Sequence, residues 1–365
     1  MSTQSDKDLI ILKVILWVYI IFCVIIAGLN YVYVKQAPEA VAKAITWSWH
    51  FYENWVKTTF IIIASFLTIR IITRTQRTQM RKNNLIGFIT AALCVHIVTP
   101  LILNNSELYF FTMPLPWTTT PLQLLFKDSY FYASRFPFWG LNGITAALIF
   151  YVIISVVVLI GTVLFGRRWQ CSTICLFNGF AAEVFAPAFP LIGKKKPVQF
   201  TKIKVLMIIK WVMLCLAVLF SVYWILLLFG VTVWKNYDLV GKLENYKYLS
   251  AELLMMMFFW IAFLGRGYCY YCPLGTILGL LGNICGQKVT TNKTKCINCN
   301  QCNLACPMTI DIKSKALKGE SVTSLRCVGC GHCMDACTTE TLAYTTTFLS
   351  AIAKKKAPMD QNLTL

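Results

Sequence analysis

The chain carries eight cysteines in two short runs near its C-terminal end. The first run reads KCINCNQCNLACP and the second reads RCVGCGHCMDAC. In both runs the cysteines follow the spacing C-x-x-C-x-x-C-x-x-x-C. Three closely spaced thiolates can bind three irons of one cubane cluster, while the fourth thiolate reaches a second cluster. The two runs together therefore predict two [4Fe-4S] clusters.

The rule that the fourth cysteine of each run crosses over to the other cluster assigns the ligands. The first cluster is expected to be bound by Cys296, Cys299, Cys302 and Cys337. The second cluster is expected to be bound by Cys327, Cys330, Cys333 and Cys306. A zinc ribbon is the alternative, because paired CxxC motifs also suit tetrahedral zinc. We disfavour it because zinc would not use the third cysteine of each run.

Two further cysteine pairs lie upstream. The segment GRRWQCSTICLFNG contains Cys171 and Cys175, and the segment GRGYCYYCPLGTILG contains Cys269 and Cys272. Each pair follows a Gly-Arg dipeptide at the end of a long apolar run. Four thiolates that converge there would match the ligand count of a third cluster, either [4Fe-4S] or [2Fe-2S]. A redox dithiol pair and cysteines with only a structural role are the alternatives.

The composition is that of a membrane protein. Of the 365 residues, 57% are hydrophobic and only 13% are charged, whereas about 25% are charged in a soluble domain. Twelve of the 16 cysteines lie in the four motifs, so a secreted disulfide scaffold is not expected. Such thiols belong in a reducing compartment. The other four cysteines are interpreted as small buried apolar residues: Cys23, Cys94, Cys215 and Cys285.

Six apolar runs approach the roughly 20 residues that a membrane span requires. They cover residues 10–34, 55–72, 85–103, 141–165, 205–233 and 251–264. The first run is too long for a signal peptide and has no small-residue cleavage site. The sequence predicts a mainly α-helical protein with three parts. They are a polytopic transmembrane helix bundle of about six spans (1–287), an α+β double-cubane ferredoxin domain (288–348) and a basic C-terminal tail (349–365).

The charges of the loops predict the orientation. Five basic residues and no acidic one lie between spans two and three, at Arg70, Arg74, Arg77, Arg81 and Lys82. Seven basic residues and the single Glu183 lie between spans four and five. By the positive-inside rule both loops are cytoplasmic. An even number of spans then places both termini and the ferredoxin domain on the cytoplasmic side of the inner membrane.

The net charge of +19 follows largely from this topology, so binding to nucleic acid is not needed to explain it. Five tryptophans are expected to form an aromatic belt at the outer headgroups: Trp47, Trp49, Trp55, Trp117 and Trp139. The segment 104–139 is rich in proline and aromatic residues. It is interpreted as a lid, a docking surface for a partner or an interfacial segment.

The chain has three histidines. His96 lies in the middle of a span and His50 in an expected outer loop, so a haem bound by two histidines is not expected. His96 is a candidate to bind a quinone carbonyl, because ionisable residues inside a membrane are functional candidates by default. Packing against a neighbouring helix is the alternative for His96. His332 is interpreted as a solvent-side residue that tunes a cluster through hydrogen bonding.

The arrangement of apolar helices, paired cysteines and a terminal double ferredoxin resembles a known family. It resembles the NapH-type membrane ferredoxins of periplasmic nitrate reductase systems and, more broadly, the NosR-like and CcoG-like polyferredoxins. The resemblance covers approximately residues 141–348. Two CxxxCP motifs are typical of the family, but here Leu176 follows Cys175, and the pair Cys269 and Cys272 is one residue closer. The resemblance implies quinol oxidation or quinone reduction coupled to one-electron transfer through iron-sulfur centres.

No nucleophile triad, Walker loop, dinucleotide fingerprint or zinc-protease motif occurs in the sequence. The chain is therefore expected to position redox centres rather than to make bonds. The preferred hypothesis is an electron-transfer subunit that connects the quinone pool with a redox partner subunit of an oxidoreductase complex. The alternative is a redox maturation or regulatory factor for the assembly of another metalloenzyme. An ion-translocating redox pump is disfavoured because few charged residues fall within the expected spans.

Overall fold

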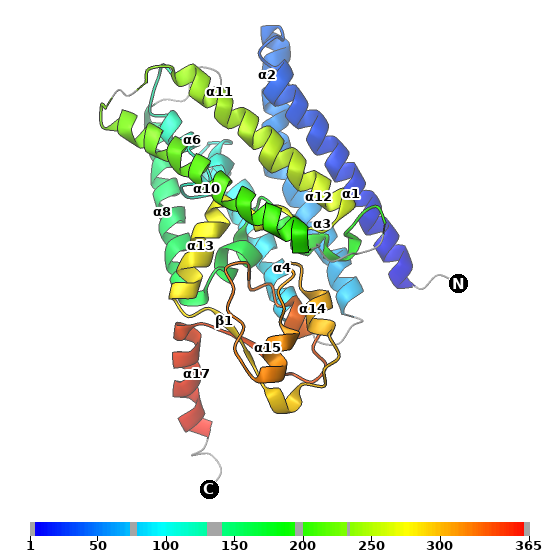
Figure 1. Cartoon of the computed structure of the whole chain (residues 1–365). Coiled ribbons are helices and arrows are strands. Elements are labelled where there is room, and N and C mark those ends of the chain that lie inside the picture. Colours follow the sequence, from blue (N-terminus) through cyan, green and yellow to red (C-terminus); the bar gives the residue numbers. More distant parts are fainter. Residues whose placement is uncertain (1–3, 74–78, 130–140, 194–199, 232–233, 361–365) are drawn as a thin grey trace.

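The computed structural model describes residues 4–73, 79–129, 141–193, 200–231 and 234–360 (Figure 1). The N-terminal part is a bundle of long helices, and the cysteine-rich region lies at one end of it. The start of α1 lies at the same end as the cysteine-rich region. The fold class expected from the sequence is therefore confirmed.

Three continuous helical stretches open the chain. They are α1 (Gln4–Gly28) with η1 (Leu29–Tyr33); α2 (Glu39–Phe51) with η2 (Tyr52–Val56) and α3 (Lys57–Ile72); and α4 (Gln79–Ala92) with η3 (Leu93–Val98) and α5 (Thr99–Ile102). The middle stretch begins well before the predicted span 55–72. Residues 39–51 contain no glycine or proline, and Lys43 pairs with Glu39 one turn earlier at 2.7 Å, which favours a helix over a loop.

A short irregular segment follows, with η4 (Leu108–Phe111) and α6 (Thr120–Gln123). It folds into the bundle, where Leu108, Phe111 and Met113 are buried. The predicted aromatic belt is wrong for two of its members. Trp49 is only 1% exposed, and Trp117 packs edge-on against Phe177. Trp47 and Trp55 are exposed, and Trp139 lies outside the described residues.

The second half of the bundle contains two long helices and the short elements that carry the upstream cysteine pairs. They are α8 (Leu141–Phe165), η5 (Gln170–Ile174), α9 (Gly179–Val184), η6 (Ala186–Ala188), α10 (Phe200–Leu228), η8 (Tyr268–Tyr270) and α13 (Pro273–Ile284). Helix α13 packs against α8 and α10. The basic residues Arg74, Arg77 and Lys194 to Lys196 lie outside the described residues.

Five of the described helical stretches are long and apolar enough to cross a membrane. They are Asp6–Tyr33, Glu39–Ile72, Gln79–Ile102, Thr145–Phe165 and Lys202–Leu228. The sixth expected run, 251–264, ends a continuous stretch of α11 (Tyr237–Lys247), η7 (Tyr248–Leu254) and α12 (Met255–Ala262). This stretch is not among the five, because α11 at its start is rich in charged residues.

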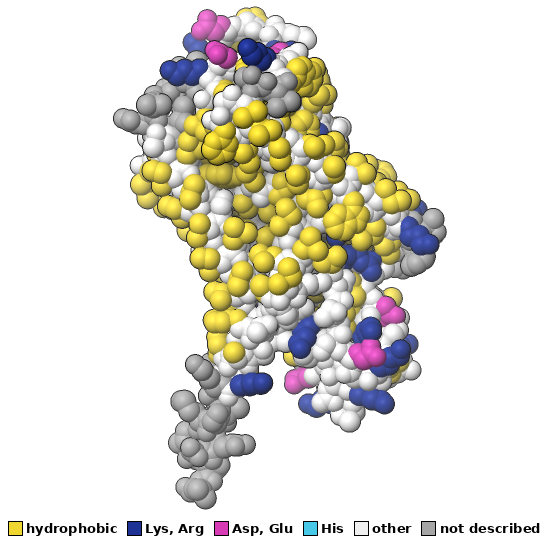
Figure 2. Space-filling view, turned by 60° about the vertical axis from the view of Figure 1, so that its left-hand side comes forward, with side chains coloured by type: hydrophobic (Ala, Val, Ile, Leu, Met, Phe, Trp, Pro, Cys, Tyr) yellow, Lys and Arg dark blue, Asp and Glu magenta, His cyan; other side chains and the backbone are white. Residues whose placement is uncertain are grey.

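The outer surface of the bundle is apolar. Ile10, Val152 and Ile208 are each at least 60% exposed, and apolar side chains form a broad band between two ends where charged side chains gather (Figure 2). Backbone groups in such a band must be satisfied within the chain, which continuous helices achieve. The band therefore identifies the surface that contacts lipid.

The cysteine-rich region is a small α+β unit, as expected. Strand β1 (Lys288–Thr291) pairs antiparallel with β2 (Leu342–Thr345), with Lys288 opposite Thr345. Between the strands lie η9 (Lys293–Lys295), α14 (Gln301–Ala305), α15 (Lys313–Lys318) and α16 (His332–Asp335), and α17 (Thr347–Asp360) follows β2. Pairing the first and last segments of this region closes it around both cysteine runs.

Candidate metal centres

The structure gathers the eight C-terminal cysteines into two groups. One small cavity is lined by Cys296, Cys299, Cys302 and Cys337. A second cavity is lined by Cys306, Cys327, Cys330 and Cys333. These are the two sets of four that the crossover rule assigns, so in each group one cysteine comes from the other run. The remaining walls of the second cavity include Val289, Ile312 and Val328, an apolar surrounding that keeps water from the sulfurs.

The backbone between the cysteines repeats in the two runs. Asn298 and Asn300 have positive φ angles of 60° and 65° in the first run. Gly329 and Gly331 occupy the equivalent positions of the second run, with φ angles of 63° and 84°. Asparagine and glycine adopt this left-handed conformation most easily. The turns bend the chain so that successive sulfurs point to a common centre.

The upstream cysteines also come together, at the end of the bundle nearest the cysteine-rich region. Cys171 lies in η5 and Cys175 directly follows it, while Cys269 lies in η8 and Cys272 precedes α13. Burial, together with the nearby thiols of Cys171 and Cys269, raises the pKa of Cys175 to about 11. Burial and the three neighbouring thiols also raise the pKa of Cys272. The four sulfurs therefore form one buried group.

Two buried arginines surround this group. Arg167 donates from Nε to the sulfur of Cys171 at 3.3 Å and from Nη2 to the carbonyl of Cys269 at 3.2 Å. Arg266 donates from Nη1 to the carbonyl of Cys171 at 3.0 Å. Both side chains are at most 2% exposed. Buried cations need partners of opposite charge, and four thiolates around a metal centre provide such a charge, so the donor set fits an anionic cluster.

Hydrogen bonds join the upstream group to the second cysteine run. Ser172 donates to the carbonyl of Val328 at 2.7 Å, and Asn84 donates to the carbonyl of Cys330 at 2.9 Å. Arg167 donates to the carbonyl of Leu325 at 2.7 Å. The cavity of the second run is thus fixed directly against the upstream cysteines.

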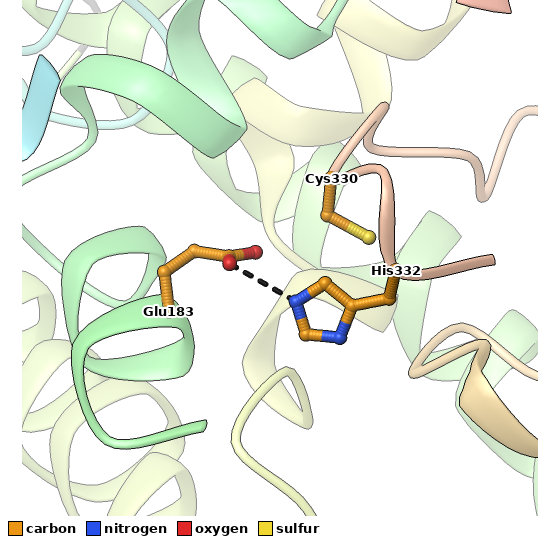
Figure 3. A group of neighbouring side chains, drawn as sticks. All are labelled: Glu183, Cys330 and His332. Carbon is orange, nitrogen blue, oxygen red and sulfur yellow. Dashed lines mark hydrogen bonds and ion pairs between the residues drawn. The ribbon is translucent and has the colours of Figure 1, made fainter. Parts of the chain in front are cut away.

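A buried charged group lies at the same junction (Figure 3). The Nε2 atom of His332 lies 3.0 Å from Glu183, and Glu183 also forms an ion pair with Arg266. Burial acts to raise the pKa of Glu183, but His332 and Arg266 outweigh it and lower the pKa to about 2. Ligand atoms of Glu183, Cys330 and His332 lie within 4.8 Å of one another.

The prediction that His332 faces solvent is wrong, because its side chain is only 13% exposed and points to Glu183. Glu183 was not among the site residues predicted from the sequence. It is the single acidic residue of an otherwise basic loop, and this position could have indicated a specific role.

A polar cavity of about 100 Å³ lies inside the bundle. We call it the bundle cavity. Its ionisable lining residues are Glu53, Lys57, His96, Glu244, Lys247 and Glu252. Only His96 among them was predicted as a candidate site residue. Glu53 precedes the predicted span 55–72, whereas in the structure Glu53 and Lys57 both lie in the continuous helix of α2, η2 and α3.

The two histidines of the bundle, His96 and His50, have defined partners. His96 is 2% exposed, and its Nδ1 atom contacts the carbonyl of Glu53. His50 lies in α2 and pairs with Glu107 at 2.5 Å. It is therefore part of a helix and not of an outer loop.

A family described as "4Fe-4S dicluster domain" matches residues 288–338, the region that contains the eight C-terminal cysteines. An uncharacterized protein of Methanocaldococcus jannaschii is 30% identical over 48% of this chain and 62% of its own length. The ferredoxin-type protein NapH of Escherichia coli is 28% identical over 67% of this chain and 80% of its own.

A putative electron transport protein of Escherichia coli, YccM, is 28% identical over 27% of this chain and 28% of its own. No solved structure matches the chain.

Proposed function

We propose that this NapH-type polyferredoxin connects the quinone pool with a redox partner subunit of an oxidoreductase complex. An electron-transfer role for a ferredoxin-type membrane protein agrees with the names of its relatives. The observation that carries the proposal is the series of three cysteine groups that begins at the membrane bundle. A bound iron-sulfur cluster accepts and releases one electron at a time, and each of the three groups offers four sulfurs.

We assign the ligands of the two ferredoxin clusters as the crossover rule does. Cys296, Cys299, Cys302 and Cys337 hold the first, and Cys327, Cys330, Cys333 and Cys306 hold the second. Each set of four lines one of the two cavities, which supports this assignment. Cysteines must lose their protons to bind iron, so loading releases protons and depends on pH.

Cys171, Cys175, Cys269 and Cys272 hold a third cluster in this proposal. The proximity of the four thiols, which raises the pKa of Cys272, and the two buried arginines support it over a dithiol pair. A disulfide would be neutral and would leave Arg167 without an anionic partner at the sulfur of Cys171. The hydrogen bonds from Ser172 and Arg167 to residues 325–328 hold this group beside the second ferredoxin cavity.

The far end of the series faces a redox partner. Cys299 is exposed, and four exposed lysines lie on the elements near the first run, at Lys293, Lys295, Lys315 and Lys318. A partner with an acidic docking face would be attracted to this surface, and added salt would weaken the association. The cytoplasm is the compartment that we assign to this surface, because the loops at this end carry the basic residues.

The test is reduction of the clusters in the full chain, purified without oxygen and placed in lipid nanodiscs. A quinol analogue is expected to bleach the cluster absorbance until the chain's own centres are reduced, and then to stop. The Cys330→Ser variant should reach a smaller extent of bleaching. Cys215→Ser is the control, because Cys215 lies on α10 outside the motifs and should behave as the unaltered chain. Sustained turnover of a soluble substrate by this chain alone would contradict the relay.

A further inference from the structure

The bundle cavity has walls from several parts of the chain. Among them, Glu53 and Lys57 come from η2 and α3, His96 from η3, Trp117 from the segment between η4 and α6, and Glu252 from η7. Its volume of about 100 Å³ is of the same order as the ~150 Å³ cavity that holds a benzene ring. The space is therefore suited to one six-membered ring.

Four of the charged side chains of the cavity form two ion pairs. Lys57 lies 2.8 Å from Glu53, and Lys247 lies 2.7 Å from Glu252. All four side chains are at most 15% exposed. The carboxylate of Glu244, which also lines the cavity, accepts hydrogen bonds from neutral donors. Ionisable residues inside a membrane bundle are costly and mark functional sites. Because the two lysines already pair with carboxylates, the cavity suits a neutral ligand that forms hydrogen bonds, rather than an anion.

Aromatic side chains form the rest of the wall. Tyr31, Trp117, Phe177 and Tyr248 line the cavity, and the rings of Tyr31 and Tyr248 lie 5.6 Å apart. Ligand sites for flat apolar molecules combine such rings with a few polar groups. A neutral ring that carries oxygen atoms at both ends fits this combination.

From these observations we infer that the bundle cavity binds the headgroup of a quinol or quinone. The inference rests on the proposed function and adds to it the place of binding and the groups that exchange protons. His96 faces one oxygen of the headgroup, and Glu252 faces the other.

The hydrogen bond of His96 determines which nitrogen can accept a proton. Its Nδ1 atom contacts the backbone carbonyl of Glu53, and a carbonyl can only accept, so Nδ1 carries the hydrogen. In the neutral ring Nε2 then has the free lone pair. Nε2 is the base that takes the proton of a quinol hydroxyl.

Glu252 is better suited to the second proton than Glu244. Glu244 accepts hydrogen bonds from Thr119, Gln123 and Trp224, so its oxygens are already engaged. Glu252 accepts from Lys247 and from the hydroxyl of Tyr268. Tyr268 directly precedes Cys269, and its ring lies 5.1 Å from that of Phe177, two residues after Cys175.

The reaction balances with the groups named. Quinol loses one proton to Nε2 of His96 and one to the carboxylate of Glu252, and it becomes quinone. Its two electrons would leave one at a time through a cluster held by Cys171, Cys175, Cys269 and Cys272, and each would pass on to one of the two ferredoxin clusters. Leu176 and Phe177 line the cavity directly after Cys175, so the electrons cross a short distance. Quinone reduction is the same sequence in reverse.

The experiment uses the full chain in nanodiscs, a short-tailed benzoquinol as the electron donor and dithionite as a donor that needs no cavity. His96→Leu and Glu252→Gln are compared with the control variants His50→Leu and Asp238→Asn. His50 is a partly buried histidine of the bundle, with a side chain 14% exposed, and Asp238 is an exposed carboxylate of α11. His96→Gln is included because its amide can still donate to the carbonyl of Glu53 while it cannot accept a proton.

We expect His96→Leu and His96→Gln to slow cluster reduction by benzoquinol about 10²-fold, the size of a lost general base. Reduction by dithionite should be unchanged, and both control variants should match the unaltered chain. Glu252→Gln should also slow the quinol reaction and shift its pH profile.

The possible failures are distinct. If dithionite but not benzoquinol reduces the unaltered chain, the proposed function and the inference both fall. If benzoquinol reduces it and the His96 and Glu252 variants match their controls, only the cavity assignment falls. Misfolding of His96→Leu would show as lost iron, and His96→Gln then decides the question.

Discussion

At the scale of single residues, the cysteine groups depend on the backbone conformation between the cysteines as well as on the cysteines themselves. The repeated positive φ angles at Asn298, Asn300, Gly329 and Gly331 let two loops of different composition form the same turn. A Cβ atom at Gly331 would also lie 2.7 Å from the side chain of Met80. Glycine is therefore needed there both for the backbone and for the contact with α4.

Iron content tests the third group of cysteines. Three cubanes give about twelve irons per chain, a [2Fe-2S] third cluster gives about ten, and the ferredoxin domain alone gives about eight. The double variant Cys171→Ser with Cys269→Ser should contain about eight irons. The matched control is Cys94→Ser with Cys215→Ser. These two cysteines lie outside the motifs and are exposed, not buried as predicted, so the control should keep the full content. About eight irons in the unaltered chain, unchanged in the double variant, would exclude the third cluster.

At the scale of elements, Glu183 connects three segments of the chain through ion pairs. It lies in α9 and contacts Arg266, just before η8, and His332 in α16. The side chains of Glu183 and Arg266 are at most 1% exposed. One carboxylate thus fixes the ferredoxin region to the end of the bundle where the upstream cysteines lie.

Removing this carboxylate should destabilise the junction. Glu183→Gln leaves Arg266 buried without its partner, and breaking a buried ion pair costs about 3–5 kcal/mol. Thermal unfolding of the purified chain should therefore begin at a clearly lower temperature. Glu320→Gln is the control, because the pair of Glu320 with Lys315 is about half exposed and such pairs contribute about 0–1 kcal/mol. Equal melting of the two variants would argue against a structural role for Glu183.

At the scale of the whole molecule, the redox groups form a series with a direction. The bundle cavity is lined by residues of η2, η3 and η7, the upstream cysteines lie in or next to η5 and η8, and the ferredoxin region lies at one end of the bundle (Figure 1). Basic residues lie beside the ferredoxin region: Arg81 of α4 lines a cleft with His332, and Arg168 lies over the ring of Tyr344. This arrangement would carry electrons between the membrane interior and a soluble or peripheral partner.

Reporter fusions test the orientation of this axis. A reporter fused after Leu365 should behave as cytoplasmic, because the basic loops mark that side. A reporter inserted at Lys35 to Ala37, between η1 and α2, should behave as periplasmic or extracellular, because one apolar stretch separates it from the N-terminal end. A periplasmic result for the C-terminal fusion would overturn the orientation and the compartment inferred for the cysteines.

The sequence by itself determined the features that depend on spacing and composition. The two ferredoxin sets of cysteines, the α+β unit and the apolar helices could all be predicted, because cluster loops are local and membrane spans are continuous. The folded chain gathers Cys296 to Cys302 with Cys337 as the spacing requires. The run 251–264 could also be recognised from the sequence as an apolar run shorter than a full membrane span.

Only the tertiary structure decided which distant polar residues meet. Glu183, Arg266 and His332 are far apart in sequence, and no local pattern pairs them. Glu53 and Lys57 lie at the start of the predicted span 55–72 or just before it, and packing of η2 against η3 and the segment before α6 buries them around a cavity. A buried charge is tolerated only when a partner is brought to it, and that partner comes from another element. The fold therefore determines which polar residues meet in the interior, and the spacing of the cysteines does not predict them.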